Sequence, residues 1–211
     1  MKILYLENID STQTYLKEHI REKKLQAPYA VVSDTQTSGV GSRGNLWTSQ
    51  NGNLFLSFAI SLQELPDDLP LESASIYFAY ILKETLNVMQ SQVWLKWPND
   101  FYIDNLKMGG MITNITKETL ICGVGLNISN APEGFAKLDI DAKREEILET
   151  YFRNIEKKVS WKQIFSKYQL EFYKSQKFFT HNNNVKISLK EAILQNDGSI
   201  ISNGERIYNS R

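Results

Sequence analysis

The stretch Gln36-Thr-Ser-Gly-Val-Gly-Ser-Arg-Gly-Asn-Leu-Trp47 lies between two strand-like apolar runs. Tyr29-Ala-Val-Val-Ser33 precedes it, and Asn53-Leu-Phe-Leu-Ser-Phe-Ala-Ile60 follows it. Short apolar runs of this length and composition are typical of buried β-strands. A glycine-rich segment that leads into a strand matches neither the Rossmann fingerprint, which opens a helix, nor the P-loop, which ends in Gly-Lys-Ser/Thr. The stretch therefore predicts a site built on a strand–loop–strand connection.

The residue types in this loop suit a nucleotide phosphate. Gly39, Gly41 and Gly44 allow a ligand to approach the main chain closely. The guanidinium of Arg43 suits an anion, and Trp47 offers a flat face to a ring. These features predict a nucleotide-phosphate site. A glycine-rich surface turn is the alternative that this stretch alone leaves open.

Composition restricts the class of protein. The chain has 211 residues, which is enough for one core and a small annex. Lys+Arg and Asp+Glu both number 24, and this zero net charge argues against a protein that coats nucleic acid. The single cysteine, Cys122, excludes an internal disulfide and fits a reducing compartment. The N-terminal apolar stretch is too short for a signal peptide, and no run approaches a membrane span. We expect a cytoplasmic protein without membrane or nucleic-acid partners.

Hydrophobic periodicity predicts an α+β fold. Strands are expected over residues 2–7, 29–33, 53–60, 93–97, 101–103, 107–115 and 120–128, and helices from Ser11 to Ile20 and over 79–89, 147–155 and 161–172. The polar stretch His181-Asn-Asn-Asn184 is the expected domain boundary. Beyond it, Asp197-Gly198 and Asn203-Gly204 are strong hairpin signals. His19, on a charged helix, and His181, in a linker, are expected to be solvated.

Five short motifs follow one another between residues 8 and 130. They are Ser11-Thr12-Gln13, Gln36 with Gly39–Trp47, Lys96-Trp-Pro-Asn-Asp100, Lys107-Met-Gly-Gly-Met111 and Gly123-Val-Gly-Leu-Asn127. In this order and at these spacings they resemble the motifs of the biotin protein ligases. The Lys-Trp-Pro-Asn-Asp motif is the most specific of the five, whereas Gly-x-Gly-x-Asn alone would be weak.

This resemblance implies a fold and an activity. Residues 1–180 would form a catalytic domain with a mixed β-sheet flanked by helices, and residues 181–211 a small SH3-like β domain. The implied enzyme is a biotin–[acetyl-CoA-carboxylase] ligase, which forms biotinyl-5'-AMP from biotin and ATP. It then transfers biotin to a lysine of a biotin carboxyl carrier protein of acetyl-CoA carboxylase or a related carboxylase. Mg²⁺ is expected to bridge the ATP phosphates and keep several waters, so no protein-only metal cage is expected. The expected state is a monomer or a weak homodimer.

The resemblance also assigns site residues. Lys107 would bridge the biotin carboxylate and the α-phosphate, Lys96 would support it electrostatically, Asp100 would orient the incoming lysine amine, and Arg43 completes the catalytic set. The expected biotin-binding residues are Ser11, Thr12, Gln13, Gln36, Gly39, Lys107, Gly109 and Gly110. The expected ATP- and adenylate-binding residues are Gly41, Ser42, Arg43, Gly44, Trp47, Asn99 and Asn127. For several of these the residues alone leave ordinary roles open, such as an exposed hairpin lysine at Lys107, a turn cap at Asp100 or core packing at Trp47.

One departure from the family pattern concerns the loop. The family sequence usually reads Gly-Arg-Gly-Arg-x-Gly-Arg-x-Trp, and its three arginine positions here hold Val40, Ser42 and Asn45. The only arginine, Arg43, stands at the variable place. Either Arg43 turns toward the phosphate, or backbone amides and Lys107 carry more of the charge.

Four other functions remain to be weighed. They are a lipoate-protein ligase-like activity, a lipoyl or octanoyl transferase with Cys122 as nucleophile, a non-catalytic biotin-binding module and a biotin-responsive DNA-binding repressor. An apolar strand around Cys122 favours an inert thiol. The repressor is disfavoured because the biotin motif begins at Ser11, which is expected to leave no room for a helix-turn-helix before it.

Overall fold

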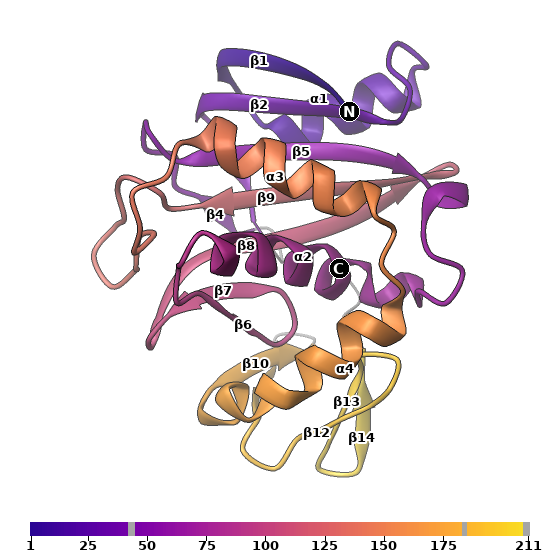
Figure 1. Cartoon of the computed structure of the whole chain (residues 1–211), viewed down its shortest axis with the longest axis vertical. Helices are drawn as coiled ribbons and strands as arrows, with labels where there is room; N and C mark the ends of the chain where they lie inside the picture. Colours follow the sequence, from indigo (N-terminus) through magenta and orange to yellow (C-terminus); the bar gives the residue numbers. More distant parts are fainter. Residues whose placement is uncertain (42–44, 183–184, 209–211) are drawn as a thin grey trace.

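A seven-stranded sheet forms the centre of the molecule (Figure 1). The structure is a computed structural model and describes residues 1–41, 45–182 and 185–208. The strands run in the order β1 (Lys2–Ile9), β2 (Tyr29–Gln36), β5 (Leu54–Ser61), β9 (Thr119–Leu126), β8 (Leu106–Thr116), β7 (Asp100–Ile103) and β6 (Trp94–Lys96). Only β1 and β2 pair in parallel within this sheet, so the predicted mixed sheet is confirmed.

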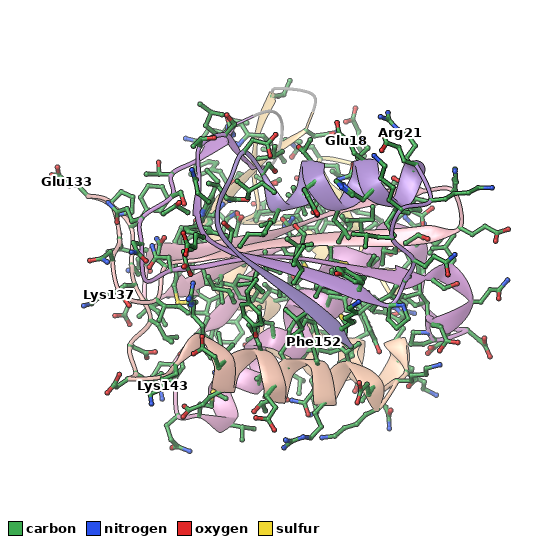
Figure 2. The ribbon with its side chains drawn as sticks, turned by 90° about the horizontal axis from the view of Figure 1, so that it is seen from above. Glu18, Arg21, Glu133, Lys137, Lys143 and Phe152 are labelled. Atoms are coloured by element: carbon green, nitrogen blue, oxygen red, sulfur yellow. The ribbon has the colours of Figure 1, made fainter. Side chains whose placement is uncertain are left out.

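Helices cover both faces of this sheet. α1 (Thr12–Arg21) lies on one face, and α2 (Ala74–Val88) and α3 (Arg144–Glu156) lie on the other (Figure 1). Figure 2 shows the arrangement edge-on, with Glu18 and Arg21 of α1 pointing outward and Phe152 of α3 pointing toward the sheet. α1 begins as predicted, because the Ser11 side chain caps it by accepting a hydrogen bond from the Thr14 amide at 3.3 Å.

Alternate residues of strand β9 point to opposite faces of the sheet. Leu120, Cys122, Val124 and Leu126 belong to the large core beneath α2 and α3. Ile121 belongs instead to the small core beneath α1. Because successive side chains in a strand point to opposite faces, the intervening Gly123 and Gly125 face the α1 side. The α1 side therefore carries a strip of the sheet that has no side chains.

The chain after α3 forms a smaller β-rich part. It comprises α4 (Trp161–Glu171), the short 3₁₀ turn Phe172–Lys177 and the strands β10 (Phe179–Asn182), β11 (Val185–Ser188), β12 (Ile193–Leu194), β13 (Ile200–Ser202) and β14 (Glu205–Ile207), whereas the 3₁₀ turns Leu62–Glu64 and Leu71–Ser73 lie between β5 and α2. These strands confirm the predicted small C-terminal β region.

The segment around the expected domain boundary contains a pair of strands. β10 begins at Phe179 and pairs antiparallel with β11, so His181 lies in a strand and not in a linker. Leu189, Ile200 and Ile207 also pack in the large core. Apolar burial thus continues from the sheet into the C-terminal part, and the division at residues 180 and 181 stays a prediction.

A small hairpin lies in the segment that the sequence presented as a loop. β3 (Gly39–Val40) pairs with β4 (Leu46–Trp47), and the Gly41 amide donates to the Asn45 carbonyl at 2.8 Å. Ser42, Arg43 and Gly44 lie outside the described residues. Among the helices that the structure describes, none is long and apolar enough to cross a membrane.

Candidate active site

A row of paired residues crosses the α1 face of the sheet. Lys96 on β6 pairs with Asp100 on β7, Asp100 pairs with Gly110 on β8, and Gly110 pairs with Gly125 on β9. Directly opposed residues of an antiparallel pair share a face and lie close together. The row therefore has two charged residues at one end and two glycines beside them.

The charged end is a three-membered ion cluster. Lys107 Nζ donates to Asp100 Oδ1 at 2.6 Å, and Lys96 Nζ lies 3.4 Å from Asp100 Oδ2. Lys96 is buried and also donates to the Trp97 carbonyl at 3.4 Å. It does not reach solvent, because the carboxylate and this carbonyl satisfy its ammonium group inside the protein.

These two lysines control the charge of Asp100. Burial raises the pKa of the Asp100 carboxyl, but the ammonium groups of Lys107 and Lys96 outweigh that effect and hold the pKa below its usual value. Asp100 is therefore an ionised carboxylate at neutral pH. A carboxylate of lowered pKa is a weak base, so its geometry suits orientation of a cation better than proton abstraction.

A β-bulge brings Lys107 to this cluster. The register between β7 and β8 shifts between Phe101 and Tyr102, so Phe101 pairs with Gly109 but Tyr102 pairs with Lys107. An extra residue in one strand turns the following side chains to the other face. A Cβ placed on Gly110 would lie 3.6 Å from Lys107 Nζ and 3.3 Å from Asp100 Oδ1, which shows that these groups meet on one face.

Glycines form the floor of the site. A Cβ on Gly125 would lie 2.6 Å from Trp47 Cε2, and a Cβ on Gly123 would lie 2.5 Å from Gln13 Oε1. Neither distance leaves room for a methyl group, so Trp47 and Gln13 approach the backbone of β9 closely. A floor without side chains allows the same close approach to a ligand.

The other end of the site is polar and uncharged. Gln36 Oε1 accepts from the Thr12 amide at 2.8 Å and from Thr12 Oγ1 at 3.1 Å. Ser57 Oγ lies 2.9 Å from Thr12 Oγ1 and donates to Gln13 Oε1 at 3.1 Å. The buried hydroxyl and amide groups of this network offer both donors and acceptors to a neutral polar ligand group.

Both ends open into one pocket on the α1 face. Its described lining consists of Ser11, Thr12, Gln13, Gln36, Val40, Gly41, Trp47, Leu56, Ser57, Asn99, Asp100, Lys107, Gly110, Met111, Ile112, Gly123, Val124 and Gly125. The fold thus brings residues from all five sequence motifs together. Ser42, Arg43 and Gly44, which were assigned to the adenylate, lie outside the described residues.

Two polar groups in this lining are left for a ligand. Trp47 Nε1 and Asn99 Oδ1 are buried and have no hydrogen-bond partner in the described part of the chain. Asn99 itself is held in place because its Nδ2 donates to the Met111 carbonyl. Buried polar groups in native proteins are rarely unsatisfied, so one donor and one acceptor here fit contacts to a bound molecule.

Two assigned residues support the lining from behind. Gly39 pairs with Trp47 in the small hairpin, and Lys96 lies at the end of the cross-strand row, next to Asp100. Neither belongs to the described lining of the pocket. Each touches a lining residue, so each acts on the site through its neighbour.

Gly109 and Asn127 also lie outside the lining. A Cβ on Gly109 would lie 2.5 Å from the Gly125 carbonyl oxygen, so a packing requirement accounts for this glycine. Asn127 is buried, and its Nδ2 donates to the Ala136 carbonyl at 3.1 Å. The biotin contact assigned to Gly109 and the adenylate contact assigned to Asn127 remain predictions.

Sequence reasoning missed Ser57, Gly123 and Gly125 as members of the site. Ser57 lies in the middle of the apolar strand β5 and is fully buried. A lone hydroxyl in such a strand was the available signal, because a buried hydroxyl needs a partner. The two glycines belong to one of the five motifs, but their position on the pocket floor depends on which residues of β9 point to the α1 face of the sheet.

Cys122 does not reach the pocket. It is fully buried, lies in the core beneath α2 and α3, and alternates with the pocket-facing glycines of β9. Burial raises the pKa of its thiol well above the usual value, which disfavours the nucleophilic thiolate. The position of Cys122 therefore argues against the acyl transferase in which it would be the nucleophile.

Taken together, the pocket suits an elongated ligand with two different ends. The Thr12, Gln13 and Ser57 side chains fit a neutral hydrogen-bonding group, and Lys107 fits an anion. Trp47 provides an aromatic face next to the glycine floor. Fixed cations and donors around a reacting anion promote reactions in which charge develops on phosphate or carbonyl oxygens.

Comparison with known proteins shows the family to which this chain belongs. Residues 5–127, more than half of the chain, match the Biotin/lipoate A/B protein ligase family. The chain belongs to this family. A crystal structure from Helicobacter pylori, described as biotin acetyl coenzyme A carboxylase synthetase with bound biotinylated ATP, is 38% identical with a TM-score of 0.94. The alignment covers 98% of this chain and 99% of that one.

Two further relatives extend the comparison. The Aquifex aeolicus biotin protein ligase, solved with biotin and ATP, is 26% identical with a TM-score of 0.73 and is covered over 98% of both chains. The Escherichia coli bifunctional ligase/repressor BirA is 31% identical over 134 residues, which is 60% of this chain but only 40% of BirA. The chain thus matches less than half of the length of this curated relative.

Proposed function

We propose that this protein is an ATP-dependent biotin protein ligase. The observation that carries the proposal is the pocket in which a neutral hydrogen-bonding end and a cationic end are joined by a glycine floor. The relatives solved with biotin and ATP or with a biotin–nucleotide conjugate support the assignment of those ligands to this pocket. The substrates proposed are biotin, ATP with Mg²⁺ on its phosphates, and a lysine of a biotin carboxyl carrier protein.

In the first half-reaction a carboxylate oxygen of biotin attacks the α-phosphorus of ATP. The bond to the β,γ-pyrophosphate breaks, and biotinyl-5'-AMP forms. Lys107 is positioned to bind both the biotin carboxylate and the α-phosphate. Its ammonium group is partly exposed at the pocket and is held there by its ion pair with Asp100. Holding the reactants in line and stabilising charge on the phosphate are the main contributions that a protein can make to this step.

In the second half-reaction the amine of a carrier lysine attacks the acyl carbon, and AMP leaves. The ionised Asp100 is suited to bind the incoming ammonium group and to align the amine after the proton has been lost to solvent. Lys96 keeps the carboxylate charged and in place. Thr12, Gln13, Gln36 and Ser57 are proposed to hold the neutral ring system of biotin, and Trp47 and Asn99 the adenylate.

One assay tests this function directly. The purified chain is incubated with labelled biotin, ATP, Mg²⁺ and a biotin carboxyl carrier domain, and label on the carrier is measured. ATP-dependent labelling is the expected result, and a carrier whose target lysine is changed to arginine is the control. No labelling with saturating biotin and ATP would remove the proposal. Parallel reactions with lipoate and octanoate test the lipoate ligase-like alternative.

A further inference from the structure

The outer face of the β3–β4 hairpin carries two exposed apolar side chains. Leu46 is 81% exposed and Val40 is 44% exposed. The two residues are directly opposed in the hairpin register, so their side chains share one face. Single exposed apolar residues are normal on protein surfaces, but an adjacent pair on a short hairpin at a ligand site calls for an explanation.

The hairpin has opposite properties on its two faces. Trp47 pairs with Gly39, and its ring lies against Gly125 on the pocket floor. Because neighbouring residues of a strand point to opposite faces, Leu46 points away from that floor. Val40 contributes to the pocket lining and Leu46 does not. Leu46 therefore points outward, and Val40, which also lines the pocket, places the pair at the rim of the pocket.

The proposed second half-reaction brings a protein to this rim. A lysine side chain extends roughly 6 Å from its Cα, because five single bonds of about 1.5 Å separate Cα from Nζ. The amine must reach the acyl group next to Lys107 and Asp100, which lie in the same pocket as Val40. The backbone of the acceptor must therefore come down to the pocket mouth, and the residues beside its target lysine must contact the rim.

The rim is apolar where the hairpin crosses it, because Val40 lies opposite the uncharged Leu46. This pair suits contact with an apolar surface. We propose that Leu46, supported by Val40, contacts an apolar side chain that flanks the target lysine of the acceptor protein. This inference rests on the proposed ligase function and names a specificity contact for its second step.

Leu46→Ser tests the proposal through three reactions. The first is biotin-dependent exchange of pyrophosphate with ATP, which reports adenylate formation. The second is transfer of biotin from the adenylate to hydroxylamine, whose nitrogen attacks the acyl carbon, releases AMP and gives its proton to solvent. The third is transfer to an isolated biotin carboxyl carrier domain. We expect kcat/KM for the carrier to fall about tenfold, while the first two rates stay within twofold.

Ile193→Ser is the matched control, because Ile193 is an apolar strand residue that is 62% exposed in the C-terminal part. It should leave all three reactions unchanged, and Leu46→Met should restore carrier transfer. The same test is made from the other side with a carrier in which the side chains next to the target lysine are changed to serine. With the wild-type chain this carrier should show the same tenfold loss in kcat/KM, and combining it with Leu46→Ser should cause little further loss.

Two outcomes would overturn the proposal while leaving the ligase function intact. Equal losses in all three reactions would show that the pair covers the adenylate, and unchanged carrier transfer would show that Leu46 has no contact with the acceptor. A wild-type chain that fails in the exchange reaction itself would instead remove the proposed function.

Discussion

The two ends of the pocket differ in how their polar groups are held. At the charged end, Lys96, Asp100 and Lys107 lie on three adjacent strands and are joined by ion pairs. At the neutral end, Thr12 and Gln13 from α1 meet Ser57 from β5 through hydrogen bonds between uncharged groups. The difference indicates that one end is organised for chemistry on charged groups and the other for selective binding.

The largest expected effect comes from Lys107→Ala. Loss of one cation from a site with developing negative charge costs about 3 kcal/mol, or roughly a hundredfold in rate. Biotin-dependent pyrophosphate exchange should fall by that factor, which is a larger loss than the decrease in stability from leaving Asp100 with Lys96 as its remaining ion-pair partner. Lys137→Ala, which removes an exposed loop lysine (labelled in Figure 2), is the control and should have no effect. Near-normal exchange in Lys107→Ala would contradict the assignment of chemistry to this end.

Arg43→Ala should have the next largest effect. Arg43 is the only arginine of the glycine-rich loop, and a charge-assisted hydrogen bond contributes about 1.5–3 kcal/mol. Dissociation of biotinyl-5'-AMP should become about tenfold faster, and Ser42→Arg should slow it by restoring a family arginine. An unchanged dissociation rate in Arg43→Ala would place the phosphate contacts on the backbone amides and Lys107 instead.

Ser57→Ala probes the neutral end and should have a smaller effect. It leaves Gln13 Oε1 without its donor and removes a partner of Thr12, at a cost of about 1 kcal/mol. Biotin affinity, measured by calorimetry, should fall about fivefold, with kcat for pyrophosphate exchange nearly unchanged. Ser166→Ala, at an exposed helix position, is the control. A lower kcat with unchanged biotin affinity in Ser57→Ala would contradict the assignment of binding to the neutral end and of catalysis to the charged end.

The smallest effect concerns stability and its dependence on pH. The pKa of Asp100 in the folded protein lies below its ordinary value of 3.8, so this group stabilises the fold above pH 3.8. That contribution is lost as the pH falls from 3.8 through the lower folded pKa. Asp100→Asn should reduce the free energy of unfolding in urea by on the order of 1 kcal/mol at pH 7, and the difference should shrink below pH 3.8.

Asp67→Asn, at an exposed carboxylate, is the control for this measurement. A difference between wild type and Asp100→Asn that stayed constant from pH 7 to pH 3 would show that the Asp100 charge does not stabilise the fold.

Much of the fold was predictable because it depends on local patterns. Apolar periodicity located every strand of the large sheet and the four α-helices, and Ser11 marked the start of α1. The polar stretch at His181 was misread as a linker, because pairing of β10 with β11 depends on contacts that local composition does not encode. The β3–β4 hairpin was missed for a related reason, since glycine-rich sequence is typical of a loop and only the tertiary setting makes it pair.

The sequence by itself determined which residue types meet in the site. The order and spacing of the motifs pointed to Lys107, Asp100, Trp47 and the glycines through their resemblance to the biotin protein ligases, and each of these residues supplies a charge, a flat ring or a backbone conformation that few others provide. What only the tertiary structure decided was their relative orientation. The bulge between β7 and β8 turns Lys107 to the same face as Asp100, and the alternation of β9 places Gly123 and Gly125 on the floor and Cys122 in the core. The physical reason is that a one-residue change of register reverses the face of every following side chain, and register is set by packing across the whole sheet.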